Sequence, residues 1–276
     1  MKSSMVRKIT FCDVDYTVLD FNHRAGVDEL RKVSGKSTGL ADEFDAVFTL
    51  MLGGVRDGGE LFAREKKEFA ELADVVVEGD HPLPDPHWSR ELWAYRWMGD
   101  LAYSQGAIEY ADIYWKGVAA ASRMYDDAYK LLQRFRLHIR DIELVLVTSS
   151  DGRLTMLNQE KFLYDPQYAT DKKWERLVAA TLGHFIDLSR NLIVGDPISK
   201  PDPLFWKCAY EARMVGPRDK VFIVGDSYQS DISGAPFGAT TILLDRQNRY
   251  TDRKSIPPAH HVVHDLGAAM QIIESA

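Results

Sequence analysis

The stretch FCDVDYTVLD, residues 11–20, decides how the rest of this 276-residue chain is interpreted. It ends an apolar run that begins at Lys8, and it places Asp13 and Asp15 where the hydrophobic residues stop. Burial of an unpaired carboxylate is costly, so two acids at the end of a buried strand require a chemical reason.

Four later apolar runs have the same form, because each ends in polar residues. They are IELVLVTSSDG (142–152), NLIVGDP (191–197), KVFIVGDS (220–227) and TTILLD (240–245). Helical spacing separates some of them, as in DPLFWKCAYEARM (202–214). Strands that alternate with helices predict an α/β fold with a mostly parallel sheet covered on both faces.

Residues 21–121 follow a different pattern. They hold three helical stretches, at 58–76, 87–105 and 107–124, and no second convincing strand appears before residue 142. We therefore expect a helical insertion after the first strand.

The cluster HHVVHD (260–265) places three histidines around two valines. A last strand of the sheet is expected here, with Val262 and Val263 as its apolar part. This favours a structural role for the histidines over a metal site.

The composition excludes several classes of protein. A net charge of -7 argues against a nucleic-acid or anionic membrane surface, although a small anionic substrate needs only a local positive pocket. Two cysteines cannot form a disulfide framework. No segment approaches the ~18 consecutive apolar residues of a membrane span or resembles a signal peptide. We expect a soluble, cytoplasmic protein whose oligomeric state is open.

Polar groups at the ends of the predicted strands suggest a shared site, since ligands of parallel sheets bind beyond the carboxyl ends of the strands. Several carboxylates in one place repel one another and need a cation, for which oxygen-seeking Mg²⁺ is the natural candidate. A lysine and a hydroxyl beside such an ion would receive a phosphoryl group. The groups are Asp13, Asp15, Thr148, Ser149, Lys200, Asp226 and Asp231.

The two acids of the first motif then have separate functions. Asp13 could attack phosphorus and form an aspartyl-phosphate, which divides the reaction into two easier steps. Asp15 could protonate the leaving oxygen and later activate water.

With these groups, the chain resembles the haloacid dehalogenase (HAD) superfamily, in particular its capped, aspartate-nucleophile phosphatases of the phosphoglycolate phosphatase-like kind. Four segments carry the resemblance, in the family's order and spacing: DVDYT (13–17), VLVTSSDG (145–152), SKPDPLFW (199–206) and VGDSYQSDISGA (224–235). The resemblance implies a Rossmann-like three-layer core formed by residues 1–20 and 122–276. Residues 21–121 would form a helical cap that closes over the site.

The resemblance also implies roles for individual residues. Asp13, Asp226 and the backbone carbonyl of Asp15 match the Mg²⁺ ligands, and Thr148 and Lys200 match the phosphate-binding groups. Ser149 is a weaker candidate for phosphate binding, because a hydroxyl there can instead cap a helix.

Supporting and specificity roles are expected of four other residues. Thr17 and Asp231 match supporting positions of the first and fourth motifs. Arg24 and Arg56 are candidates for substrate specificity in the cap. Tyr16 departs from the family pattern, since many relatives carry Gly or Asp there.

The sequence thus predicts a Mg²⁺-dependent phosphomonoesterase that acts on a small phosphorylated metabolite. A haloacid dehalogenase needs neither the metal nor the second acid, so Asp15 and Asp226 argue against it. A phosphomutase on the same fold and a non-catalytic HAD-like binding protein stay open as alternatives.

Overall fold

The computed structural model describes the parts of the chain that carry the predicted sheet and portions of the insertion. The described residues are 6–34, 106–138, 142–149, 153–158, 161–195, 198, 200, 202–248, 250 and 259–276. The predicted helical stretches at 58–76 and 87–105 lie outside them, as does Arg56.

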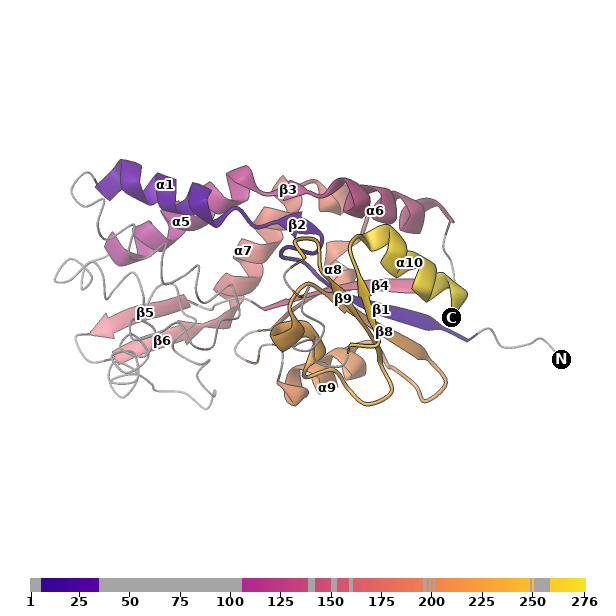
Figure 1. The fold of residues 1–276 in the computed structure, drawn as a ribbon. Coiled ribbons are helices and arrows are strands. Elements are labelled where there is room, and N and C mark those ends of the chain that lie inside the picture. The colour runs from indigo at the N-terminus through magenta and orange to yellow at the C-terminus, as the bar shows by residue number, and fades with distance from the viewer. Residues whose placement is uncertain are drawn as a thin grey trace. The chain divides into compact units, whose positions relative to one another are not determined.

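A six-stranded parallel sheet forms the centre of the fold (Figure 1), and all five predicted apolar runs supply strands to it. The spatial order is β10-β9-β8-β1-β4-β7, so the first strand lies in the interior of the sheet. The bounds are β1 (Lys8–Asp13), β4 (Ile142–Ser149), β7 (Leu192–Gly195), β8 (Lys220–Gly225), β9 (Thr240–Leu244) and β10 (His261–Val263).

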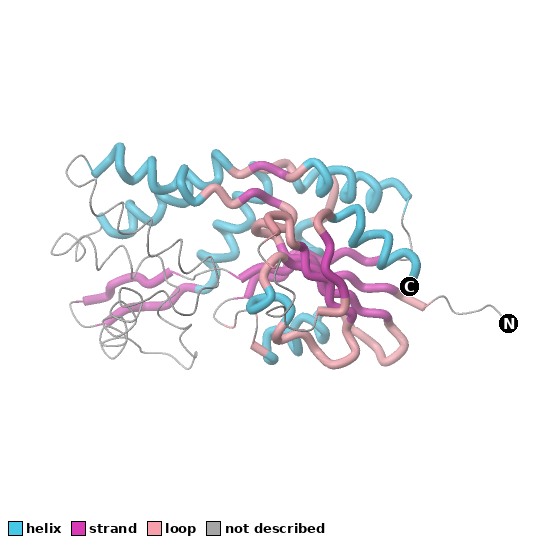
Figure 2. Tube along the Cα trace, viewed as in Figure 1, coloured by secondary structure: helices cyan, strands magenta, loops and turns pink. Residues whose placement is uncertain are grey.

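Helices cover both faces of this sheet, as expected for parallel strands that are apolar throughout (Figure 2). Helix α9 (Pro203–Ala212) lies on one face, and α6 (Asp126–His138) and α10 (Leu266–Ser275) lie on the other. The Rossmann-like α/β fold predicted from the sequence is therefore confirmed.

Helix α9 shows how the local sequence produces this layer. Asp202 accepts a hydrogen bond from the backbone N–H of Leu204 at 2.8 Å, and Pro203 occupies the first turn, where its missing N–H costs nothing. Phe205 and Trp206 are buried against apolar residues of the sheet. The apolar residues at helical spacing in the sequence thus form one apolar face of α9, which packs on the sheet.

The histidines of the 260–265 cluster hold the last strand in place. The ring Nδ1 of His260 accepts from the backbone N–H of Thr241 at 3.1 Å and lies 2.8 Å from the Thr241 hydroxyl. The ring Nδ1 of His264 lies 2.8 Å from the carbonyl oxygen of Asp245. The expected strand is present as β10, and two of the histidines join it to β9, one near the start of that strand and one just beyond its end.

The chain divides into two compact units. The first consists of residues 1–21, 123–149 and 180–276, and the second of residues 22–122 and 150–179. Short strands β2 (Leu19–Asp20) and β3 (Arg123–Met124) pair antiparallel in the first unit, where the chain first leaves it and first returns.

Within the second unit, the described elements are three helices and a hairpin. They are α1 (His23–Ser34), α5 (Gly106–Ala121), β5 (Arg153–Asn158), β6 (Lys161–Asp165) and α7 (Pro166–Ala179). Helices α1 and α5 approach closely: a Cβ on Gly26 would lie 2.5 Å from the Tyr114 ring, and one on Gly117 would lie 2.6 Å from the carbonyl oxygen of Ala25. Glycine is needed at both positions of this crossing.

This division differs from the expected boundaries in one segment. The prediction assigned all of 122–276 to the core, whereas residues 150–179 group with the second unit. The reason is that α7 packs against α5 and β5, which both belong to the second unit.

None of the helices in the described part of the chain is both long enough and apolar enough to span a bilayer.

Phe11 provides a test of the packing between β1 and α9. It is fully buried, stacks on Tyr210 with centroids 5.6 Å apart and meets the edge of Trp206 at 6.0 Å. Replacing Phe11 with Ala should lower the free energy of unfolding by about 3–5 kcal/mol in urea titrations, because it leaves a cavity under the sheet. Phe237→Ala is the control, since Phe237 is fully exposed, and its effect should stay within about 0.5 kcal/mol. Equal effects would contradict this packing.

Candidate active site

The parallel strand order brings the predicted polar groups to one edge of the sheet. Strand β1 lies between β4 and β8, and Asp13 at its end pairs in register with Val147, the residue before Thr148. Asp226 follows directly after β8. All of these side chains belong to the first unit, and Asp13, Thr148 and Asp226 are buried.

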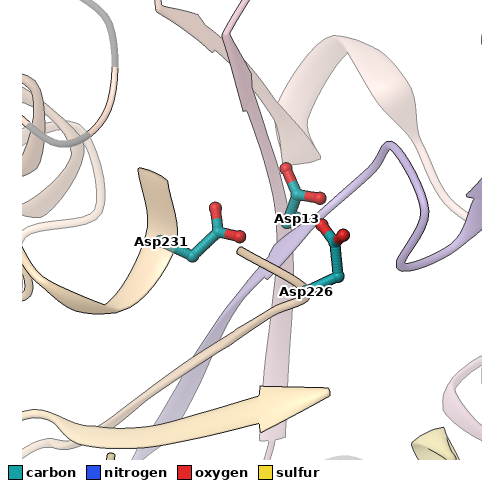
Figure 3. A group of neighbouring side chains, drawn as sticks. All are labelled: Asp13, Asp226 and Asp231. Carbon is teal, nitrogen blue, oxygen red and sulfur yellow. The ribbon is translucent and has the colours of Figure 1, made fainter. Parts of the chain in front are cut away.

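Three carboxylates meet at this edge. Ligand atoms of Asp13, Asp226 and Asp231 all lie within 4.8 Å of one another (Figure 3). Asp231 comes from the short π-helical turn Tyr228–Ile232 that follows β8. Because like charges at this spacing repel strongly in a buried setting, the group requires positive charge.

Lys200 supplies part of that charge. Its Nζ donates to Oδ1 of Asp13 and to Oδ1 of Asp231, each at 2.5 Å, and its side chain is 2% exposed. Burial lowers the pKa of Lys200, but the carboxylates of Asp13 and Asp231 outweigh burial and raise it above its ordinary value. The lysine is therefore a charged group that bridges two acids from different segments.

The Asp231 carboxylate is held on both oxygens. Oδ1 accepts from Lys200, and Oδ2 accepts from the backbone N–H of Ser227 at 3.0 Å. Burial raises the pKa of Asp231, and the Lys200 ammonium opposes that shift. With both oxygens engaged, Asp231 is suited to orient Lys200, and its supporting role in the site stays a prediction.

Asp13 is also held on both oxygens. Oδ1 accepts from Lys200, and Oδ2 accepts from the Thr17 hydroxyl at 3.0 Å. Thr17 is fully buried, so this hydrogen bond is shielded from water. The arrangement fixes the direction of the Asp13 carboxylate.

The turn between these two residues has an unusual backbone. Tyr16 has φ 59°, in the left-handed region that glycine adopts without penalty and that costs other residues about 1–2 kcal/mol. Its N–H donates to the carbonyl of Leu19 at 2.7 Å, and the N–H of Leu19 donates to the carbonyl of Val14 at 2.9 Å. A backbone in this region suits glycine better than tyrosine, so residue 16 is strained relative to a glycine there.

Other predicted residues have different surroundings. The Ser149 hydroxyl accepts from the backbone N–H of Lys200 at 3.1 Å, and the Thr148 hydroxyl donates to the Ser149 carbonyl at 3.2 Å. Ser149 thus positions the lysine backbone, while the phosphate-binding roles of both hydroxyls stay predictions.

Asp15 is half-buried, and its carboxylate is not part of the triplet found among the described residues. Arg24 is exposed on α1, and its specificity role also stays a prediction.

Sequence reasoning missed a pair of residues that reaches the same turn. Nη2 of Arg246 donates to the backbone carbonyl of Thr17 at 2.8 Å, and Asp127 forms a bidentate ion pair with Arg246. The available signal was the position of Arg246, two residues beyond β9 and hence at the same edge of the sheet. Asp127, near the start of α6, carried no such signal.

The acids suit a divalent cation. Three carboxylates and one ammonium leave a formal charge of −2 in a buried site, which a divalent ion would neutralise. Each of the three carboxylates can offer an oxygen to the ion, and the ligand roles predicted for Asp13 and Asp226 stay predictions. Carboxylate oxygens without sulfur or imidazole favour a hard ion.

Comparison with known proteins shows where such a buried, lysine-bridged group of acids at the carboxyl edge of a Rossmann-like sheet has counterparts in fold and family. Residues 197–269 match the model of the HAD-hydrolase-like family. The fold of the chain is shared with solved structures of the same superfamily. Residues 197–269 therefore carry a HAD-hydrolase-like domain, and the chain as a whole shares the fold of these structures, which confirms the resemblance predicted from the sequence motifs.

Three of the similar structures illustrate the range of the likeness. YfnB from Bacillus subtilis, described as a HAD-hydrolase and solved with bound magnesium, is 17% identical, with 98% of this chain and 99% of that one covered and a TM-score of 0.56. A HAD phosphatase from Thermococcus onnurineus is 17% identical, with 96% and 97% covered and a TM-score of 0.53. An L-2-haloacid dehalogenase from Xanthobacter autotrophicus is 16% identical, with 98% and 99% covered and a TM-score of 0.57. None of the curated proteins matches the chain in sequence.

Gly225 offers a test of the site's geometry. A Cβ at this position would lie 2.2 Å from Oδ2 of Asp231, so Gly225→Ala must displace the acid that holds Lys200. We expect the free energy of unfolding to fall by about 1–3 kcal/mol, as measured by urea denaturation. The matched control is Gly183→Ala, where the nearest atom lies 4.0 Å away and the change should be within about 0.5 kcal/mol. A Gly225→Ala protein as stable as its control would refute the close approach.

Proposed function

We propose that this protein is a Mg²⁺-dependent phosphomonoesterase that acts on a small phosphorylated metabolite through an aspartyl-phosphate at Asp13. The observation that carries the proposal is the fixed Asp13 carboxylate, which accepts from Lys200 and Thr17 and lies among acids that require a cation. The phosphoglycolate phosphatase-like subtype is part of the same proposal.

The first chemical step forms the covalent intermediate. An oxygen of Asp13 attacks phosphorus, the bond from phosphorus to the ester oxygen breaks, and Asp15 gives its proton to the leaving alcohol. Lys200 keeps Asp13 oriented and offsets negative charge on the phosphoryl oxygens, and Thr148 is the further phosphate ligand. A magnesium ion held by Asp13, Asp226 and the Asp15 carbonyl would supply additional neutralisation of charge.

The second step releases phosphate. Asp15, now ionised, removes a proton from water, and the resulting nucleophile attacks phosphorus. The bond from phosphorus to the Asp13 oxygen breaks, and the free carboxylate returns. Each group ends in its starting protonation state.

A dehalogenase is the principal alternative, because L-2-haloacid dehalogenases are among the similar structures. A dehalogenase needs the nucleophile but not a metal-binding group of acids. The buried triplet of Asp13, Asp226 and Asp231 therefore favours the phosphatase. A phosphomutase would retain the same acids and differ in its product.

Replacement of the nucleophile is the primary test. Asp13→Asn should reduce Mg²⁺-dependent phosphate release by roughly 10⁴-fold or more, because the amide cannot form the acyl phosphate. The assay compares wild type and variant on a panel of phosphorylated sugars, nucleotides and short organic acids, with EDTA as the metal-removal control. Halide release from 2-haloacids that persists in EDTA would show that the protein is a dehalogenase and not a phosphatase. An isomeric sugar phosphate as product would indicate a mutase.

The role of Asp15 has a separate test. Asp15→Asn removes both the acid of the first step and the base of the second, so we expect each step to slow by about 10²–10⁴-fold. Rapid-quench measurement of phosphoenzyme formation and decay separates the two rates. If both rates were unchanged, Asp15 would be neither the acid nor the base, whereas the assignment of Asp13 as the nucleophile would be unaffected.

A further inference from the structure

Arg246 lies two residues beyond the end of β9, at the same sheet edge as the acids, but it contacts neither Asp13 nor Lys200 in any hydrogen bond of the described residues. We propose that Arg246 is a positioning residue that fixes the direction of the Asp13 carboxylate by anchoring the turn after β1 through Thr17. Its effect on catalysis rests on the proposed function, whereas its effect on the turn does not.

The guanidinium of Arg246 makes three strong contacts. Nη1 donates to Oδ2 of Asp127 at 2.8 Å and Nη2 to Oδ1 of Asp127 at 2.9 Å, while Nη2 also donates to the carbonyl of Thr17 at 2.8 Å. A planar guanidinium can engage a carboxylate and a carbonyl together, whereas an ammonium on a flexible stem lacks that geometry. The side chain of Arg246 is 17% exposed, so these bonds are largely shielded from water.

The partner of Arg246 is itself firmly held. Oδ2 of Asp127 accepts from the backbone N–H of Leu266 at 2.8 Å, and Oδ1 accepts from that of Ala128 at 2.9 Å. These amides lie at the starts of α10 and α6, where unpaired N–H groups favour a negative charge. Burial raises the pKa of Asp127, but the hydrogen bonds from Arg246 and Leu266 outweigh burial and lower it. The anchor is therefore an ionised carboxylate fixed to two helices.

A second contact ties the same turn to the same anchor. The centre of the Tyr125 ring lies 4.2 Å from Cζ of Arg246, within cation–π range, and the backbone N–H of Tyr125 donates to the carbonyl of Val18 at 3.1 Å. The carbonyls of Thr17 and Val18 are thus both held by neighbouring groups that contact each other. Two successive peptide units of the turn are fixed from outside it.

The connection to Asp13 runs through the Thr17 side chain. Its hydroxyl donates to Oδ2 of Asp13 at 3.0 Å, leaving Lys200 on Oδ1. A shift of the Thr17 backbone therefore moves the donor that orients the nucleophile. A misplacement of about 1 Å at a reacting group can reduce a rate on the order of 100-fold.

Arg7 provides a matched control. It also donates to a carboxylate, that of Glu143, through Nε and Nη2, and to a backbone carbonyl, that of Arg213, at 3.1 Å. Arg7 precedes β1 and hence lies at the opposite end of that strand from Asp13. Arg7→Gln removes a comparable ion pair without touching the turn.

The kinetic arm of the test compares Arg246→Gln with Arg7→Gln on the substrate that wild type prefers. We expect kcat of Arg246→Gln to fall on the order of 10- to 100-fold while KM changes by less than about 3-fold, because the nucleophile is misdirected but binding is retained. Arg7→Gln should keep the wild-type kcat at a similar loss of thermal stability. If Arg246→Gln folds poorly, Arg246→Lys takes its place, and its kcat should also fall, since lysine cannot form the fork.

A double-mutant cycle tests the route through Thr17. Thr17→Val removes the hydroxyl that reaches Asp13. The loss of kcat in the double variant Thr17→Val with Arg246→Gln should therefore be smaller than the product of the losses in the two single variants. Fully multiplicative losses would mean that Arg246 acts by another route and would overturn the proposal.

Hydrogen exchange tests the anchor without reference to activity. The amides of Tyr16, Val18 and Leu19 form hydrogen bonds inside the turn, and they should exchange faster in Arg246→Gln but not in Arg7→Gln. Unchanged exchange overturns the inference even if wild type proves not to be a phosphatase. Faster exchange with an unaltered kcat in an active enzyme also overturns it. Faster exchange with a selective loss of kcat supports it.

Discussion

The two hydrogen bonds of the Lys200 ammonium, to Asp13 and to Asp231, are the interaction on which the carboxyl edge of the sheet depends. They join β1 and the turn after β8 to the connection between β7 and α9, three segments far apart in the sequence. Without this cation, the buried acids would repel one another in a setting where water cannot screen them. One lysine does not neutralise three carboxylates, so the acids that the fold buries here would also attract a second cation.

The order of the strands determines which groups can share this charge. Because β1 is flanked by β4 and β8, its terminal acid lies between the hydroxyls that end one neighbour and the acid that follows the other. Burial on both faces requires the strands to be mainly apolar, which concentrates the charged groups of the site at their ends. The close approach of Gly225 to Asp231 shows how little space remains between β8 and the turn that follows it.

Local patterns were sufficient to predict the strands, the helix α9 and the residues that line the sheet edge. They were insufficient where the structure depends on distant contacts. The apolar residues of 153–165 form a hairpin that groups with the second unit, and no local feature separates such a hairpin from a strand pair of the core. Arg246 and Asp127 are 119 residues apart, and a single arginine after a strand has no periodicity to reveal its partner. The hydrogen bond that the Ser149 hydroxyl accepts from the N–H of Lys200 is likewise a contact that only the fold creates.

The backbone of Tyr16 indicates how rigid the turn after β1 must be. A tyrosine in the left-handed region is retained only where surrounding contacts compensate for the strain of about 1–2 kcal/mol. Its N–H is bonded to Leu19 and its ring meets the edge of Phe21 at 5.9 Å, while the carbonyl of Thr17 is held from outside the turn. A carboxylate on such a turn is presented in one direction whichever electrophile it meets. Under the proposed function, the charge around Asp13 then decides which electrophile can approach, and here two further acids and one lysine surround that position.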